Sequence, residues 1–271
     1  MLMNSNSRFI TPLLAVAIVL IGLSSCKDKT KAAEEPEKKS LTIGNSTISE
    51  PAIDNYVQKI DAIPEEEMPY MASLHYLNDY EDVQVKAFLE DSAVVKIVES
   101  FIDNTNNTFG RRIYYMQNDN LVFVRELKQE PTADSIGQMH ETISYYKNGD
   151  VSKSAEKTAK FEEDLDTTNY VSCKKRTMPF DNLVALMNRE GKYTTNYLGF
   201  IKAGDFQFLW LGENDKDGLT TTLMIDLQDK FIADLLKNPT KNLGKHMDVD
   251  FEPSTIQGIT YQMYRGGSFT K

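Results

Sequence analysis

The chain has 271 residues, with 30 basic and 40 acidic side chains and a net charge of −10 at pH 7. This acidity disfavours nucleic acid as a partner, because phosphate binding needs a basic surface. It also disfavours broad electrostatic adhesion to anionic lipid. The length suffices for one large folded domain or two small ones.

The amino-terminal residues form an export pattern. Arg8 is the only charged residue before an apolar run from Leu13 to Leu23. This run is shorter than the roughly 20 apolar residues that a bilayer-spanning helix needs, and its length is typical of a signal-peptide core. Two small residues and a cysteine follow it directly, in the order Leu23-Ser24-Ser25-Cys26.

This order resembles the lipobox of bacterial lipoproteins, and the resemblance covers only the leader. It implies that a signal peptide of residues 1–25 is cleaved between Ser25 and Cys26. It also implies that Cys26 carries diacylglycerol and usually a further acyl chain such as palmitate. Each buried methylene contributes about 0.8 kcal/mol, so two or three chains hold a protein firmly on a bilayer. The alternatives are an ordinary secretory leader or a short membrane helix with a chance cysteine.

Residues 26–48 are predicted to be a disordered tether, because they are highly charged and lack aromatic side chains. Lys27 stands where an aspartate would retain an enterobacterial lipoprotein in the inner membrane, so its presence favours the outer membrane. Lys27-Asp28 also resembles the start of the surface-export tag of Bacteroidota lipoproteins, although Lys29 departs from it. Periplasmic and surface-facing orientations both stay open.

A short helix is predicted after the tether. Ser49 is a candidate cap and Pro51 suits the first helical turn. Apolar side chains then recur at helical spacing from Ile53 to Ile60. Pro64 is expected to end the helix.

From about Asp82 the apolar residues alternate, and three successive segments each indicate a strand, a turn and a strand. Asn118-Asp119-Asn120 and Asn148-Gly149 stand at two of the bends, and Asn-Gly between alternating runs is a strong hairpin signal. We predict an antiparallel meander of about six strands, which with the helix forms a domain over residues 49–178.

Residues 179–271 are predicted to be a second unit: a helix, then strands, a further helix and two more strands. This order resembles that of an OB-type barrel, and Leu243-Gly244-Lys245 resembles the turn before the fourth strand of such barrels. The alternative is that the first sheet continues into a single domain. In either case the chain is expected to be α+β and β-rich, with a few short helices.

Three aromatic residues are candidate ligand contacts. Tyr114 and Tyr145 lie at similar places in two of the repeated strand segments, so a tyrosine-rich sheet face is a candidate site for a glycan or peptide. Trp210, the only tryptophan, lies in a strand expected to be apolar on both faces. For all three, packing in the core is the competing interpretation.

No catalytic residue, metal site or cofactor is expected. Residues 213–218 have oxygen ligands at alternate positions before a glycine, as in half of a calcium loop, but Met224 stands where the closing glutamate is needed. Asp217-Gly218 is therefore more simply a hairpin turn. His75, His140 and His246 lack metal-ligand spacing. Cys173 has no partner if Cys26 is lipidated, and it is expected to be packed rather than nucleophilic.

Three functional hypotheses follow. The lipid anchor, the tether and the β-rich body favour a non-enzymatic envelope protein that binds a protein partner. The second hypothesis is a lipoprotein that binds a small ligand or glycan, and the third is a hydrolase whose site residues are dispersed along the sequence.

Overall fold

The computed structural model describes residues 50–131 and 137–270. The predicted signal peptide, lipidated Cys26, tether and Ser49 cap lie outside the described residues. Within the described ranges, no helix has the length and apolar character needed to cross a bilayer.

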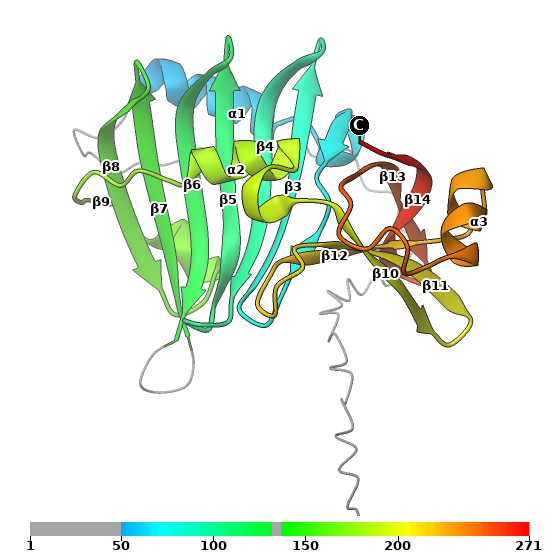
Figure 1. The fold of residues 1–271 in the computed structure, drawn as a ribbon. Coiled ribbons are helices and arrows are strands. Elements are labelled where there is room, and N and C mark those ends of the chain that lie inside the picture. Colours follow the sequence, from blue (N-terminus) through cyan, green and yellow to red (C-terminus); the bar gives the residue numbers. More distant parts are fainter. Residues whose placement is uncertain (1–49, 132–136, 271) are drawn as a thin grey trace, which may run out of the picture.

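Six long antiparallel strands form the larger part of the molecule (Figure 1), so the predicted meander is confirmed. They are β3 (Glu81–Glu90), β4 (Ala93–Asp103), β5 (Thr108–Gln117), β6 (Asn120–Glu130), β7 (Gln138–Lys147) and β8 (Asp150–Ala159). Both residues of the Asn118-Asp119 and Asn148-Gly149 turns have positive φ angles, as type I′ hairpin turns require. The Asp91-Ser92 turn has the same geometry although its sequence carries a weaker signal.

Two α-helices cover opposite faces of this meander (Figure 1). α1 (Pro51–Asp61) buries Val57 and Ile60, the face that its spacing predicted. α2 (Phe180–Asn188) buries Leu183 and Leu186 and ends where Arg189 adopts a left-handed conformation. Three short 3-10 helices complete this part: η1 (Glu65–Glu67), η2 (Glu163–Thr167) and η3 (Gly191–Tyr193).

The remaining strands extend the same sheet on both sides. β9 (Val171–Ser172) pairs with β8, and β1 (Tyr70–Ala72) pairs with β3. On the other side, the order β10-β11-β12-β2-β3 carries the sheet into the carboxy-terminal part. The strands concerned are β2 (Tyr76–Leu77), β10 (Asn196–Ala203), β11 (Phe206–Gly212) and β12 (Thr220–Met224), and α3 (Lys230–Lys237), β13 (Met247–Ile256) and β14 (Ile259–Phe269) follow them.

The predicted order of strands, helix and strands is present, but an OB-like barrel is not supported because the sheet stays open. β14 meets β12 at the single pair Met224–Met263, and β10 meets the start of β13 at the isolated bridge Asn196–His246. β12 has only five residues, and Thr220 at its start pairs with Leu77 of β2. Too few β12 residues are left for a continuous ladder with β14.

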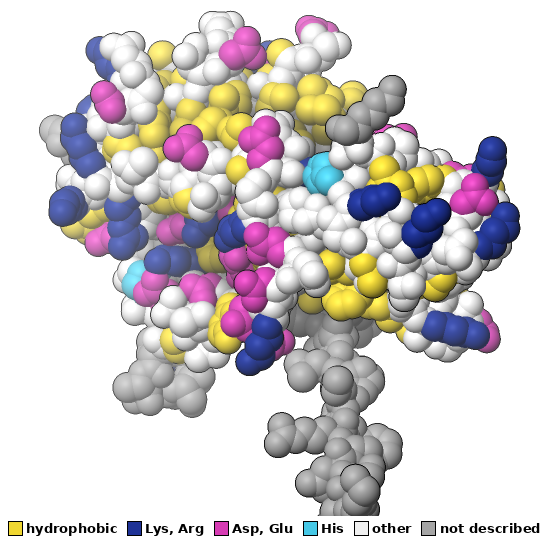
Figure 2. Space-filling model, in the orientation of Figure 1, with side chains coloured by type: hydrophobic (Ala, Val, Ile, Leu, Met, Phe, Trp, Pro, Cys, Tyr) yellow, Lys and Arg dark blue, Asp and Glu magenta, His cyan; other side chains and the backbone are white. Residues whose placement is uncertain are grey.

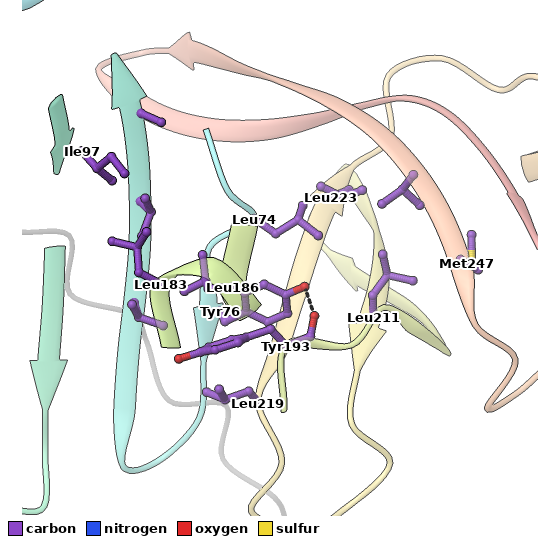
Figure 3. Close-up of a cluster of buried hydrophobic side chains, with 14 of the residues drawn as sticks. Leu74, Tyr76, Ile97, Leu183, Leu186, Tyr193, Leu211, Leu219, Leu223 and Met247 are labelled. Carbon is purple, nitrogen blue, oxygen red and sulfur yellow. Dashed lines mark hydrogen bonds between the residues drawn. The ribbon is translucent and has the colours of Figure 1, made fainter. Parts of the chain in front are cut away.

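One hydrophobic cluster joins the two predicted domains. It runs from the α2 face of the meander into the core of the carboxy-terminal part. Tyr76 lies in its middle, fully buried, and its hydroxyl donates a hydrogen bond of 2.5 Å to the carbonyl of Tyr193 (Figure 3). A second cluster, under α1, contains Phe88, Tyr115 and Tyr145.

A row of paired charges crosses the α2 face of the meander. It consists of Glu99, Arg112 and Glu126, and we call it the charged row. Arg112 donates from Nε to Glu126 at 2.5 Å and from Nη1 to Glu99 at 3.1 Å, and Tyr114 donates to Glu99 at 2.7 Å. Burial disfavours the charged form of Arg112 and by itself would lower its pKa. The carboxylates of Glu99 and Glu126 outweigh this effect and raise the pKa of the guanidinium. Charged side chains gather on this face below α2 (Figure 2).

We predict that Arg112→Ala destabilises the fold by about 3–5 kcal/mol, because it leaves two buried carboxylates without their cation. Arg111 is a matched control on the same strand. It faces the other way and pairs with Glu162, and both side chains are more than half exposed. Arg111→Ala should therefore cost less than about 1 kcal/mol in urea unfolding. Equal losses for the two variants would contradict a stabilising role for the charged row.

Candidate ligand-binding cleft

The two tyrosines singled out in the sequence do not share a surface. Both are fully buried, and they lie in the clusters on opposite faces of the sheet. The Tyr114 hydroxyl donates to Glu99, whereas that of Tyr145 donates to Asp54 of α1 at 2.6 Å. Burial, with the neighbouring carboxylate, raises the pKa of each phenol. Their geometry corresponds to the packing interpretation.

Trp210 has a different environment. It lies on β11, which is central between β10 and β12 as expected. Leu209 and Leu211 are fully buried on one face of β11, whereas Trp210 is only partly buried and Phe206 is 42% exposed on the other. The expectation that both faces are core is therefore wrong for this strand, and Trp210 is available at a surface.

That surface is a cleft of about 650 Å³, here called the Trp210 cleft, at the junction between the meander and the carboxy-terminal part. One wall comes from the turn between β2 and β3 and from Asn104. The other walls come from β10, β11, β12, the β11–β12 loop and the turn before β13. The lining residues are Leu77, Asn78, Asp79, Asn104, Tyr197, Leu198, Trp210, Glu213, Asn214, Asp215, Lys216, Gly218, Thr220, Leu243 and Gly244.

Irregular backbone shapes the carboxy-terminal walls. A β-bulge lies between Tyr197 and Gly199, opposite Trp210 and Leu211, and it places Leu198 at the cleft. Bulges redirect side chains and are common beside binding sites. Gly212 has a φ of +143°, and a Cβ there would lie 2.3 Å from the Leu219 carbonyl oxygen. Only glycine allows the β11–β12 loop to approach β12 this closely.

Hydrogen bonds tie the meander wall to the carboxy-terminal wall. Nδ2 of Asn78 donates to the Asp217 carbonyl at 2.7 Å, and its Oδ1 accepts from the backbone of Tyr80 and Glu81. Thr220 donates to the Leu77 carbonyl at 3.3 Å. The β11–β12 loop therefore lies beside the β2–β3 turn (Figure 1), and both walls are fixed before any ligand arrives.

On the core face of the sheet, opposite Trp210, Tyr197 packs beside Phe200 and carries a buried hydroxyl without a partner. Tyr197 is fully buried, and its hydroxyl has no hydrogen bond within the described part of the chain. Burial raises the pKa of this phenol. A buried unsatisfied polar group costs about 1–3 kcal/mol, so it is rarely retained without a reason.

A second cleft, of about 720 Å³, lies below α2 over the charged row. Its charged side chains already have partners: Glu81 pairs with Lys192, Asp82 with His75, and Glu99 with Arg112. Lys128 pairs with Glu130, and Asp103 accepts from Asn106. A ligand would have to displace these contacts. Fewer side chains of the Trp210 cleft are already bonded to other described residues, so this cleft is the better candidate for a ligand-binding site.

The described residues contain no group of three or more His, Cys, Asp or Glu side chains placed to hold a metal ion. Residues 213–219 form the connection between β11 and β12, closed by a hydrogen bond from the Gly218 amide to the Asp215 carbonyl. Within that same part of the chain Cys173 forms no disulfide, and burial together with Glu156 raises its pKa despite Arg176 nearby.

Comparison with known proteins adds no assignment. No protein-family model, no curated protein and no solved structure matches the chain. The cleft was only partly predictable from sequence, since Trp210 was a candidate but the β2–β3 turn and the bulge gave no clear signal.

We predict that Tyr197→Phe leaves the free energy of unfolding unchanged or raises it, because the substitution removes an unsatisfied hydroxyl. Tyr76→Phe is the matched control, since Tyr76 is equally buried in the same cluster but donates to Tyr193. It should cost about 1–3 kcal/mol by leaving that carbonyl unpaired. Urea unfolding of both variants is the measurement, and a loss at Tyr197 as large as at Tyr76 would mean that the Tyr197 hydroxyl is satisfied in the folded protein.

Proposed function

We propose that this chain is a lipid-anchored envelope protein whose folded part reversibly binds a saccharide in the Trp210 cleft. The observation that carries the proposal is a partly exposed tryptophan in a cleft that is also lined by Asp79, Glu213 and Asn214, whose side chains make no hydrogen bond to another described residue.

A saccharide ring has an apolar C–H face and a rim of hydroxyl groups. Trp210 offers a flat apolar surface for that face, and aromatic contacts contribute about 0.5–1.5 kcal/mol beyond area burial. Asp79, Glu213 and Asn214 line the same cleft and supply acceptors for hydroxyl donors. A mainly preformed cleft with a few convergent polar groups is typical of small-ligand sites.

The test uses the tryptophan itself. Because Trp210 is the only tryptophan, its emission reports directly on the cleft, and a panel of soluble trisaccharides should quench or shift it saturably. Trp210→Ala should weaken binding by at least about tenfold in calorimetry, through the lost aromatic contact. Phe206→Ala is the control, because Phe206 is an exposed aromatic at the other end of β11 that does not line the cleft. Equal weakening by both variants, or no response across the panel, would contradict the proposal.

The membrane anchor rests on the Leu23-Ser24-Ser25-Cys26 pattern. We place the protein at the outer membrane, facing either the periplasm or the exterior, because Lys27 stands where the inner-membrane retention signal would be. Metabolic labelling with a palmitate analogue should mark the wild-type chain and not Cys26→Ser, while Cys173→Ser keeps the label. Label on the Cys26→Ser variant would contradict lipidation at that position.

Binding of a protein partner is the second candidate function, and one observation favours it. β1 pairs only with β3 among the described strands, and Tyr70 and Met71 on it are 43% and 47% exposed. A partner strand could add to this edge. Crosslinking in intact cells from a photoreactive residue at Met71 should capture a reproducible neighbour, and capture no more specific than from an exposed loop position such as Asn106 would exclude this surface.

A further inference from the structure

We infer that the ligand of the Trp210 cleft is an extended, linear oligosaccharide whose chain leaves the cleft along β11. This inference rests on the proposed function, since it specifies the length and shape of a saccharide for the same cleft. Three features carry it: a row of aromatic side chains that begins at Trp210, the open space beside that row, and the orientation of a fourth ring next to it.

Trp210 is the first of three aromatic side chains on one face of β11, here called the aromatic row. Phe208 and Phe206 follow at every second residue, on the face opposite Leu209 and Leu211. Trp210 and Phe208 are partly buried and Phe206 is exposed, and none of the three belongs to a hydrophobic core cluster of the described residues. Four residues of a strand span about 13 Å, so the row extends well beyond a single sugar ring.

The neighbouring strand β10 leaves the aromatic row open. The β10 residues that pair with the row are Gly199, Ile201 and Ala203. Gly199 lies opposite Trp210 with a φ of +130°, and no heavy atom lies within 4 Å of the position that a Cβ would take there. Ala203, opposite Phe206, is too short to cover a ring. Both ends of the row are therefore accessible from the β10 side.

Tyr261 of β14 widens the surface beside the aromatic row. Its ring centre lies 6.2 Å from that of Phe206 and 6.4 Å from that of Phe208, with angles of 33° and 35° between the ring planes. The other aromatic pairs of the described residues meet at 46° to 71°, closer to the edge-to-face packing of a core. The Tyr261 ring therefore extends the apolar surface instead of standing edge-on against it.

Polar groups beside the aromatic row favour a saccharide over a purely apolar partner. Thr222 of β12 pairs with Trp210, and the hydroxyls of Thr222 and Tyr261 make no hydrogen bond to another described residue. A sugar ring offers an apolar face to each aromatic ring and hydroxyl groups at its edge to such partners. Because the row continues directly from the cleft, one chain contacts both. A straight row suits an extended β-1,4-linked chain better than a coiled one.

The test compares cellotriose with cellohexaose, two neutral β-1,4-linked chains that differ only in length, added to the full chain. A trisaccharide centred on Trp210 does not reach Phe206, whereas a hexasaccharide contacts the whole row. We expect cellohexaose to bind roughly thirtyfold more tightly in calorimetry, through at least two further aromatic contacts. A gain of about fourfold or less, which the several equivalent positions of a trisaccharide unit in the longer chain already supply, would overturn this inference and leave saccharide binding in place.

Phe206→Ala should lower the affinity for cellohexaose by roughly tenfold and leave cellotriose unchanged. Phe109→Ala on β5 is the control, because Phe109 is 48% exposed against 42% for Phe206 and lies outside the row and the cleft. Equal effects of the two variants on cellohexaose would overturn the inference. So would a lack of binding by both probes while another trisaccharide binds, whereas no binding by any saccharide would overturn the proposed function as well. If a variant fails to fold, the ratio of the two wild-type affinities decides.

Discussion

The structure depends on a short join between two parts of one sheet. β2 has only two residues, yet it pairs with β3 on one side and with β12 on the other. Tyr76 of β2 is fully buried, and its hydroxyl fixes the Tyr193 carbonyl, which lies between α2 and β10. This buried contact holds the carboxy-terminal part in register with the meander. The Trp210 cleft exists because the join brings the β2–β3 turn beside the β11–β12 loop.

The two clefts differ in how their charges are used. A buried charge without a partner destabilises the fold. In the charged row, one guanidinium pairs with two carboxylates, so none of the three charges is left unpaired. Such an arrangement stabilises one conformation and leaves nothing free for a ligand. At the Trp210 cleft the carboxylates are nearer to solvent and unpaired, so they keep the capacity to bind. The pairing of charges, more than the size of a cleft, distinguishes the charged row from the cleft that we propose as a binding site.

The sequence predicted the local structure well where the signal was local. The Asn148-Gly149 turn, the apolar face of α1 and the alternating strands of the meander are as expected. The faces of the tyrosines were not predictable, because strand pairing sets them. Tyr145 lies opposite Phe123, which lies opposite Tyr115, so the equivalent of Tyr145 is Tyr115 and not Tyr114. A shift of one residue moves a side chain to the other face of a sheet.

Long-range contacts account for the other differences. Glu99 and Glu126 carry charged side chains and would be expected to face solvent, but Arg112 from the strand between them allows both to be buried. The two residues of β2 are too few to give a periodic signal. The barrel resemblance correctly gave the order of the elements, but closure depends on ladder contacts that five residues of β12 cannot provide.

One continuous core, joined at Tyr76, holds both walls of the Trp210 cleft. Hydrogen exchange of the full chain in increasing urea, read by mass spectrometry, tests this most directly. Amides of β5 and β6 in the meander and of β11 and β12 beyond the join should lose protection with the same midpoint, as one cooperative unit. Loss of protection in β11 and β12 at a clearly lower urea concentration would show that the two parts fold independently, and would contradict a single continuous core.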